Sequence, residues 1–462
     1  MKKLKFLSAL VFFCSAAQAQ QSPPAPPPSA FTTEDSRVIN LEEQVRALAE
    51  EVALLRAEVR EMRDAKSSRP PSSEPVLLAA THVEPGVLPT ATSSSASASV
   101  VASSAPAQAT QTQTLGGATS NAKLLNPDIS MIGDFIGNAG HNSVSPSPSL
   151  QLHESELGLQ AIIDPYARAD MFLSFGEEGV NVEEGYITFT SLPAGLLLKV
   201  GKMRAEFGKV NTIHNHALPF IDRPLVTDNL VGGEDGIDDA GISVSRFLPA
   251  PKDWFVQGTA QVYRGDSDDV FHAFDRQDLS VVGHLRVYRD LGESTNIEVG
   301  GSYARGHNTA GVGSSYNVNN FLTNLYGIDA TLRWKPLRRS IYHSLLFRNE
   351  FIWSNRNQLS DGTTGFFETQ HAFGLYSNAD YRLNRRWTIG GRFDRSGLAN
   401  NAHLTDTGFS TILTYWPSEF SQIRGQYRFG HLADPTTGQY SYANEFLFQF
   451  LWVMGAHGAH PF

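Results

Sequence analysis

The chain has 462 residues, of which 41% are hydrophobic, and its 47 acidic and 37 basic residues give a net charge of −10 at pH 7. This length is sufficient for one large core or one large barrel. The negative charge argues against a nucleic-acid partner. The single cysteine, Cys14, lies in an N-terminal apolar run, so we expect no disulfide, thiol nucleophile or cysteine metal ligand in the mature chain.

Residues 1–19 have the layout of a secretory signal peptide. Lysines come first, an apolar run extends to Phe13, and Ala17-Gln18-Ala19 provides the small residues of a cleavage site. No other run approaches the roughly eighteen apolar residues that a membrane helix requires. A membrane span of this chain would therefore have to be made of strands.

A proline-rich spacer (20–33) precedes a predicted α-helical coiled coil (34–66). Its seam places apolar residues at alternating intervals of three and four, at Val38, Leu41, Val45, Leu48, Val52, Leu55, Val59 and Met62. The stretch from Arg37 to Glu42 resembles a pattern that favours trimeric coiled coils. The alternative is a single amphipathic helix lying on another surface. Residues 67–125 are rich in Ser, Ala, Thr and Pro, and this composition predicts a disordered linker.

From Asp128 onward the apolar period becomes two, which is the period of a β-strand with two different faces. Tyr326, Ile328, Ala330, Leu332 and Trp334, for example, alternate with polar residues. Sixteen such segments are predicted, an even number as in closed bacterial barrels. They begin near Ile129, Leu150, Tyr166, Val182, Gly195, Ala240, Trp254, Arg276, Thr295, Leu322, Ile341, Phe367, Arg386, His403, Phe420 and Tyr440.

The connections between these segments alternate between short turns and longer polar loops, as at the two rims of a transmembrane barrel. Four tryptophans (Trp254, Trp334, Trp387 and Trp416) lie beside short turns, where an interfacial aromatic girdle would place them. We therefore predict an all-β fold over 126–462, a transmembrane antiparallel β-barrel of about sixteen strands. Its expected location is the outer membrane of a Gram-negative-type bacterium, surrounded by lipid, with the N-terminal region in the periplasm.

The longest predicted loop, 207–239, carries six acidic residues against Lys209 and Arg223. Loops of this length inside a compact fold are usually functional, and we expect this one to fold into the barrel and narrow it. The predicted constriction residues are Asp222, Asp228, Glu234 and Asp235. Strand alternation places seven arginines on the lumen wall, namely Arg168, Arg286, Arg333, Arg348, Arg392, Arg424 and Arg428. They would either create a transverse field with the acidic loop or pair with wall carboxylates such as Asp170, Asp329, Glu350 and Asp394.

The segment LLLKVGKMRAEFG (Leu196 to Gly208) contains a Val-Gly pair, basic positions and a Phe-Gly pair, and the chain ends in Phe462. With the barrel layout, these residues resemble the phosphate-selective-porin-like group of sixteen-stranded trimeric porins. The resemblance implies a homotrimer that admits small solutes. It also implies that the long loop after the fifth strand folds inward as the constriction.

Histidines in the long loop (His214 and His216) and at the C-terminus (His457 and His460) are candidate metal ligands, because imidazole with nearby carboxylates suits zinc. Convergence of three or four ligands does not follow from the sequence, so we predict no resident metal or cofactor. Gly265-Asp266-Ser267 is similar to the start of some secreted esterases, but no G-x-S-x-G is present. We predict no catalytic residues and no enzymatic activity.

The leading hypothesis is an outer-membrane channel for passive diffusion of small solutes or ions. One alternative is an envelope tether, in which the coiled coil reaches peptidoglycan or periplasmic proteins and the barrel serves as an anchor. Another alternative is a zinc-related uptake protein of the outer membrane.

Overall fold

A computed structural model describes residues 127–177, 179–267, 270–360 and 365–455. The predicted signal peptide, spacer, coiled coil and linker lie outside the described residues, as does the C-terminal tail with Phe462, and all of them stay predictions. No helix among the described residues is both long enough and apolar enough to cross a membrane.

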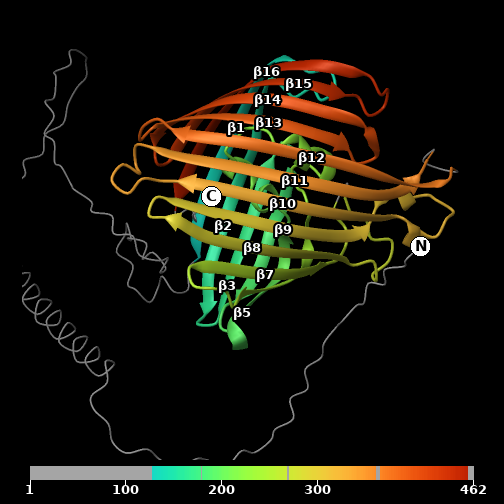
Figure 1. The fold of residues 1–462 in the computed structure, drawn as a ribbon, viewed down its shortest axis with the longest axis horizontal. Helices are drawn as coiled ribbons and strands as arrows, with labels where there is room; N and C mark the ends of the chain where they lie inside the picture. Colours follow the sequence, from blue (N-terminus) through green and yellow to red (C-terminus); the bar gives the residue numbers. More distant parts are fainter. Residues whose placement is uncertain (1–126, 178, 268–269, 361–364, 456–462) are drawn as a thin grey trace, which may run out of the picture. The chain divides into compact units, whose positions relative to one another are not determined.

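The strands in the described part of the chain form one closed antiparallel barrel of sixteen strands (Figure 1). Each strand pairs with its neighbours in the chain, and β1 closes the ring against β16, from Ser130 opposite Gly455 to His141 opposite Asn444. Closure leaves no unpaired sheet edge. The strands are β1 (Asp128–His141), β2 (Leu150–Asp164), β3 (Ala167–Gly176), β4 (Gly179–Phe189), β5 (Leu196–Arg204), β6 (Asp238–Leu248), β7 (Trp254–Tyr263), β8 (Ser280–Gly292), β9 (Thr295–His307), β10 (Leu322–Trp334), β11 (Ser344–Leu359), β12 (Phe367–Arg382), β13 (Trp387–Leu398), β14 (Asn401–Ser418), β15 (Ser421–Ala433) and β16 (Tyr440–Gly455).

The predicted sixteen-stranded barrel is confirmed, and most strands begin within two residues of the predicted positions. β4 begins three residues earlier than predicted, whereas β8 and β11 begin four and three residues later, because turns occupy the predicted first residues of these two strands. Before β8, the Asp278 carboxylate accepts hydrogen bonds from the backbone of Phe274 and Asp275. Before β11, the backbone N–H groups of Tyr342 and His343 both bond to the carbonyl of Arg339. The connection 335–343 is therefore longer than the short turn that was expected beside Trp334.

The barrel wall separates an apolar outside from a largely polar inside, as strand alternation predicts. On β16, Phe446, Phe448 and Phe450 face outward, whereas Glu445 and Gln449 are buried inside. Trp254 and Trp387 each begin a strand after a short connection and are also exposed. An outward apolar band with aromatic residues near a rim is the surface that lipid requires.

We predict that Phe448→Arg destabilises the barrel by about 2–4 kcal/mol in lipid vesicles, because a cation would lie in the hydrocarbon near mid-membrane. Phe448 lies in the middle of β16, opposite Gly137 and Gly425. The matched control is Asn444→Arg on the same outer face but nearer the rim, with an expected cost of about 0–1 kcal/mol. Urea unfolding in vesicles measures both values. Equal costs would mean that this face does not contact the hydrocarbon.

Candidate functional site

The barrel interior is occupied by the connection between β5 and β6, which we call the inner loop (residues 205–237). It contains two 3-10 turns, η2 (Val210–Thr212) and η3 (Asn215–Ala217), and the short helix α3 (Leu225–Leu230). The predicted bounds 207–239 are corrected, because Asp238 and Asp239 already belong to β6 and pair with Arg204 and Met203. The inner loop bonds to strands on nearly opposite sides of the ring, β2 and β11 among them, so it lies inside the barrel.

An apolar core joins the inner loop to the wall, which the acidic composition of the loop did not predict. Its buried loop residues are Ala205, Phe207, Val210, Ile213, Ala217, Leu218, Phe220, Val226, Leu230, Val231 and Ile237. They pack against inward-facing Leu325, Ile352 and Ile412 of the wall. Helix α3 contacts β12 and β13. Gly374 on β12 permits this approach, since a Cβ there would lie 2.6 Å from Cγ2 of Val226.

Asp222 fixes one side of the inner loop to β13 and β15. Its carboxylate accepts hydrogen bonds from Arg392 at 3.0 Å and Arg428 at 2.8 Å. The Arg392 guanidinium also lies 4.5 Å from the centre of the Phe220 ring, a cation–π arrangement. Burial alone would raise the pKa of Asp222, but the two arginines lower it below its ordinary value. Asp222 is therefore a structural anion that neutralises cations of the wall.

A second side of the inner loop is held by β9 and β11. The Lys209 ammonium pairs with Glu298 at 2.7 Å. Glu350 accepts hydrogen bonds from the backbone N–H groups of Lys209 and Val210. Backbone groups of the loop that would otherwise be unsatisfied inside the barrel are thereby bonded.

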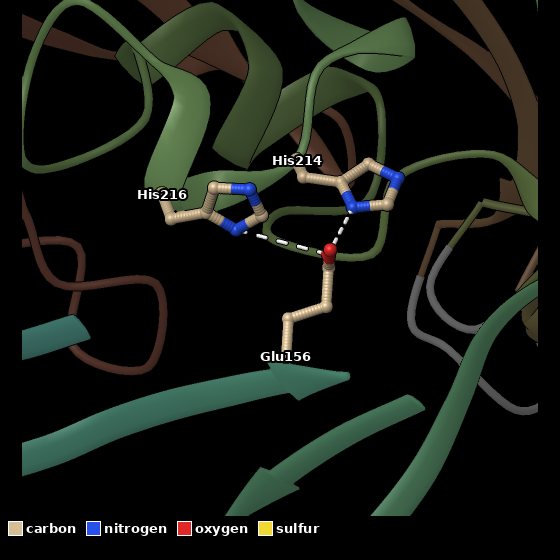
Figure 2. A group of neighbouring side chains, drawn as sticks. All are labelled: Glu156, His214 and His216. Carbon is tan, nitrogen blue, oxygen red and sulfur yellow. Dashed lines mark hydrogen bonds and ion pairs between the residues drawn. The ribbon is translucent and has the colours of Figure 1, made fainter. Parts of the chain in front are cut away.

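The third side of the inner loop is held by a buried cluster of histidines and glutamates, which lies between the loop and strands β2 and β4. Both Nδ1 atoms, those of His214 and His216, face the Glu156 carboxylate (Figure 2). Nε2 of His214 bonds to Glu184 at 2.9 Å, and Nδ1 of His216 bonds to Glu154 at 2.9 Å.

The carboxylates of this cluster control the protonation of both histidines. Burial alone would lower the pKa of His214, but the hydrogen bonds to Glu156 and Glu184 raise it to about 10. Burial would likewise lower the pKa of His216, and the hydrogen bond to Glu154 reverses that effect and raises it.

Two β-bulges, one in β2 and one in β4, direct the glutamates of the cluster to the lumen. Strict alternation of strand residues does not predict these bulges. The register between β3 and β4 shifts at Phe172 and Leu173, so that Glu183 is left without a partner on β3 and both Glu183 and Glu184 reach the cluster. The register between β1 and β2 shifts in the same way, at Asp134 and Phe135. Bulges re-aim side chains in this manner beside functional sites. The sequence signal is the run of acidic residues around His153 and at 183–184.

The four predicted constriction residues do not gather at one point. Asp222 lies against β13 and β15, whereas Glu234 pairs with His153 on β2 at 3.0 Å. Asp228 is exposed and makes no ion pair with any described residue, and Asp235 is half-buried. Only one of these carboxylates therefore contacts the predicted arginines of the wall.

Three of the seven predicted wall arginines contact the inner loop. Besides Arg392 and Arg428, Arg424 donates to the carbonyl oxygen of Phe220 at 3.2 Å. The basic wall and the acidic loop are thus in direct contact at this side. The other four arginines lie on the wall: Arg168 pairs with Asp170 at 2.5 Å, Arg348 pairs with Asp380 at 2.6 Å, Arg286 bonds to Gln257, and Arg333 is half-buried.

The remaining candidates are placed as follows. His457 and His460 lie outside the described residues. Ser267 of the Gly265-Asp266-Ser267 motif is buried, and its hydroxyl lies 3.5 Å from the carbonyl oxygen of Asp238. Of the predicted wall carboxylates, Asp394 pairs with Arg392 at 2.7 Å.

A closed antiparallel barrel with an apolar outside, a polar wall and an internal loop defines the class of transmembrane β-barrels. A more specific placement comes from one relative, an uncharacterized protein of Aquifex aeolicus (strain VF5). It is 30% identical over 397 residues, which cover 74% of this chain and 81% of the relative. The chain belongs to the same family as this Aquifex protein.

Solved structures with a similar fold include an anion-selective porin from Comamonas acidovorans (10% identity, TM-score 0.49, covering 71% of this chain and 99% of that one). OprB of Pseudomonas putida has 9% identity and a TM-score of 0.48, over 72% of this chain and 95% of its own. OmpT of Vibrio cholerae has 10% identity and a TM-score of 0.44, over 71% and 97%. No family model matches the chain. The resemblance to the phosphate-selective-porin-like group therefore stays a prediction.

Proposed function

We propose that the protein is a non-enzymatic outer-membrane channel through which small solutes or ions diffuse passively, and that the inner loop is its constriction. The observation that carries this proposal is the attachment of the inner loop to three sides of a ring whose wall is polar inside. A loop fixed in this way leaves a reduced passage of constant shape, which is how a barrel acquires size selection. The predicted signal peptide (1–19) is consistent with export to the outer membrane.

The proposal includes a homotrimer whose subunits are joined by the coiled coil (34–66). Parallel heptads hold their chains in register, and a trimer would place three barrels side by side in the lipid. The lysine-poor inner loop does not favour a phosphate-selective passage, because Lys209 is already paired with Glu298. We therefore assign no particular solute to the channel.

One observation favours a second candidate function, that of an envelope tether with a closed barrel. The apolar core of the inner loop fills space that water would otherwise occupy. In this case the coiled coil would bind peptidoglycan or a periplasmic protein, and the barrel would act as an anchor.

Planar-bilayer recording of the purified full chain separates the two functions. We expect discrete, repeated conductance steps for a channel, because each inserted barrel adds one passage. Absence of steps from protein that is shown to be folded by its heat-dependent migration would support the tether and contradict the channel. Swelling of vesicles in neutral sugars of increasing size then measures the passage.

A further inference from the structure

Three ligand atoms converge where the inner loop meets β2 and β4, and a carboxylate oxygen of Glu183 lies beside one of them. Nδ1 of His214 lies 2.5 Å from Oε2 of Glu156 and 3.2 Å from Oε2 of Glu183. Nδ1 of His216 lies 3.7 Å from the same Glu156 oxygen. Figure 2 shows both imidazole rings directed at this carboxylate. One nitrogen from each histidine and one oxygen of Glu156 lie within 4.8 Å of one another.

Two carboxylate oxygens of the cluster are buried and accept no hydrogen bond from any residue that the structure describes. They are Oε1 of Glu156 and Oε2 of Glu183, on residues that are 1% and 5% exposed. The Glu183 oxygen faces the cluster, and its charged contacts are His214 and, at 3.6 Å, Arg204. A buried acceptor without a donor is costly, and coordination to a cation would satisfy it.

The charges and outer contacts of the cluster also suit a cation. The carboxylates of Glu154, Glu156, Glu183 and Glu184 surround two imidazoles and one guanidinium, that of Arg204. Metal ligation requires both imidazoles to be neutral and so displaces their ligating-side protons, and the same groups then present a charge of −3 to the cation. Nε2 of His214 bonds to Glu184 at 2.9 Å, and a carboxylate on the far nitrogen commonly orients a metal-ligating histidine.

We propose that this cluster is a divalent-metal site suited to zinc, with His214, His216, Glu156 and Glu183 as its four ligands. Zinc accepts histidine nitrogen and carboxylate oxygen as ligands, and four protein ligands without an open position would make this a structural rather than a catalytic site. Tetrahedral ligands at about 2.1 Å from the metal lie about 3.4 Å apart. Two of the observed separations, 3.2 and 3.7 Å, are close to this value, and the 2.5 Å contact would have to open by about 1 Å.

A cavity of about 380 Å³ lies beside the cluster, and Glu183, one of the four proposed ligands, lines it. Glu154 and Glu183 line it together with His153 and Glu234.

Bound metal would join the inner loop to the wall. His214 and His216 belong to the inner loop, Glu156 belongs to β2 and Glu183 belongs to β4. The inference does not depend on the proposed function, because the same link would form in a conducting channel and in a closed anchor.

The test measures zinc content directly. Full-length protein without a histidine tag, and with His457→Ala and His460→Ala as a common background, is stripped with a chelator and dialysed against Zn²⁺. We expect about one zinc per protomer by mass spectrometry of the metal. Co²⁺ in the same site should give the intense visible absorption of tetrahedral coordination.

His214→Asn and Glu156→Gln should each abolish stoichiometric zinc binding, and Glu184→Gln should weaken it by about tenfold or more. The matched controls are His284→Asn and Glu350→Gln, which alter a half-buried wall histidine and a buried glutamate that bonds the inner loop elsewhere. Both controls should bind zinc as the background protein does. Zinc-free background protein, or unchanged binding by the His214 and Glu156 variants, would overturn the proposal. If His214→Asn does not fold, Glu183→Gln provides the same comparison.

Discussion

Deleting residues 211–233 and joining the flanks with a short Gly-Ser linker is expected to raise single-channel conductance, by a factor on the order of two or more. The deleted segment includes α3 and most of the apolar residues that fill the lumen. A sixteen-stranded barrel without an internal segment encloses an aqueous channel. Removal of the segment therefore widens the conducting cross-section.

The control for this deletion is a shortened hairpin between β15 and β16, without the exposed residues 435–438. Its conductance should equal that of the full-length protein. Both variants are first shown to be folded by heat-dependent migration. If the folded 211–233 deletion conducts like the full-length protein, the inner loop lies outside the conducting path and the proposed constriction is wrong.

The second large effect is expected from Asp222→Asn, which should make the channel more selective for anions and destabilise the barrel. The substitution removes the carboxylate between Arg392 and Arg428. Breaking a buried ion pair typically costs about 3–5 kcal/mol. We expect the lower end, because Asp394 and Glu445 continue to pair with the two arginines.

Asp228→Asn is the matched control, since it makes the same chemical change in the same loop at an exposed carboxylate with no ion pair to a described residue. It should leave stability within about 0.5 kcal/mol and shift selectivity less. Reversal potentials are measured in a low-salt gradient, where the screening length is about 30 Å at 0.01 M, and again at high salt. A larger shift of the reversal potential for Asp228→Asn than for Asp222→Asn would contradict the prediction. It would show that Arg392 and Arg428 already neutralise Asp222, so that its charge does not act on ions in the passage.

Sequence periodicity was sufficient to predict the barrel, because the alternation of apolar and polar residues within a strand is visible in a short stretch of sequence. The alternation alone places Phe446, Phe448 and Phe450 on one face of a strand. Trp254 likewise indicates the end of a strand without any information on the strands that pair with it. The length of the connection after the fifth strand indicated a functional loop, and the resemblance to porins implied that this loop folds inward. The histidines His214 and His216 could be recognised as candidate ligands by residue type.

The partners of these residues could not be predicted, because they lie across the barrel. Nothing near Asp222 in the sequence indicates Arg392 or Arg428, which are more than 150 residues away. Glu183 reaches the histidines only because a bulge breaks the alternation of β4. The net charge of the inner loop does not indicate its apolar core, whose sequence signal is the set of hydrophobic residues such as Phe207, Val210 and Phe220.

The pairing of β1 with β16 determines the order in which this molecule can be assembled. The first and last strands pair across more than 300 residues of chain. The ring therefore closes only after all the strands between them have reached the site of assembly. The inner loop precedes the strands β11 to β15 that supply many of its partners. The apolar residues of the inner loop therefore stay exposed until these C-terminal strands have joined the barrel. Assembly is expected to be slow, and during it the loop must be protected from other chains.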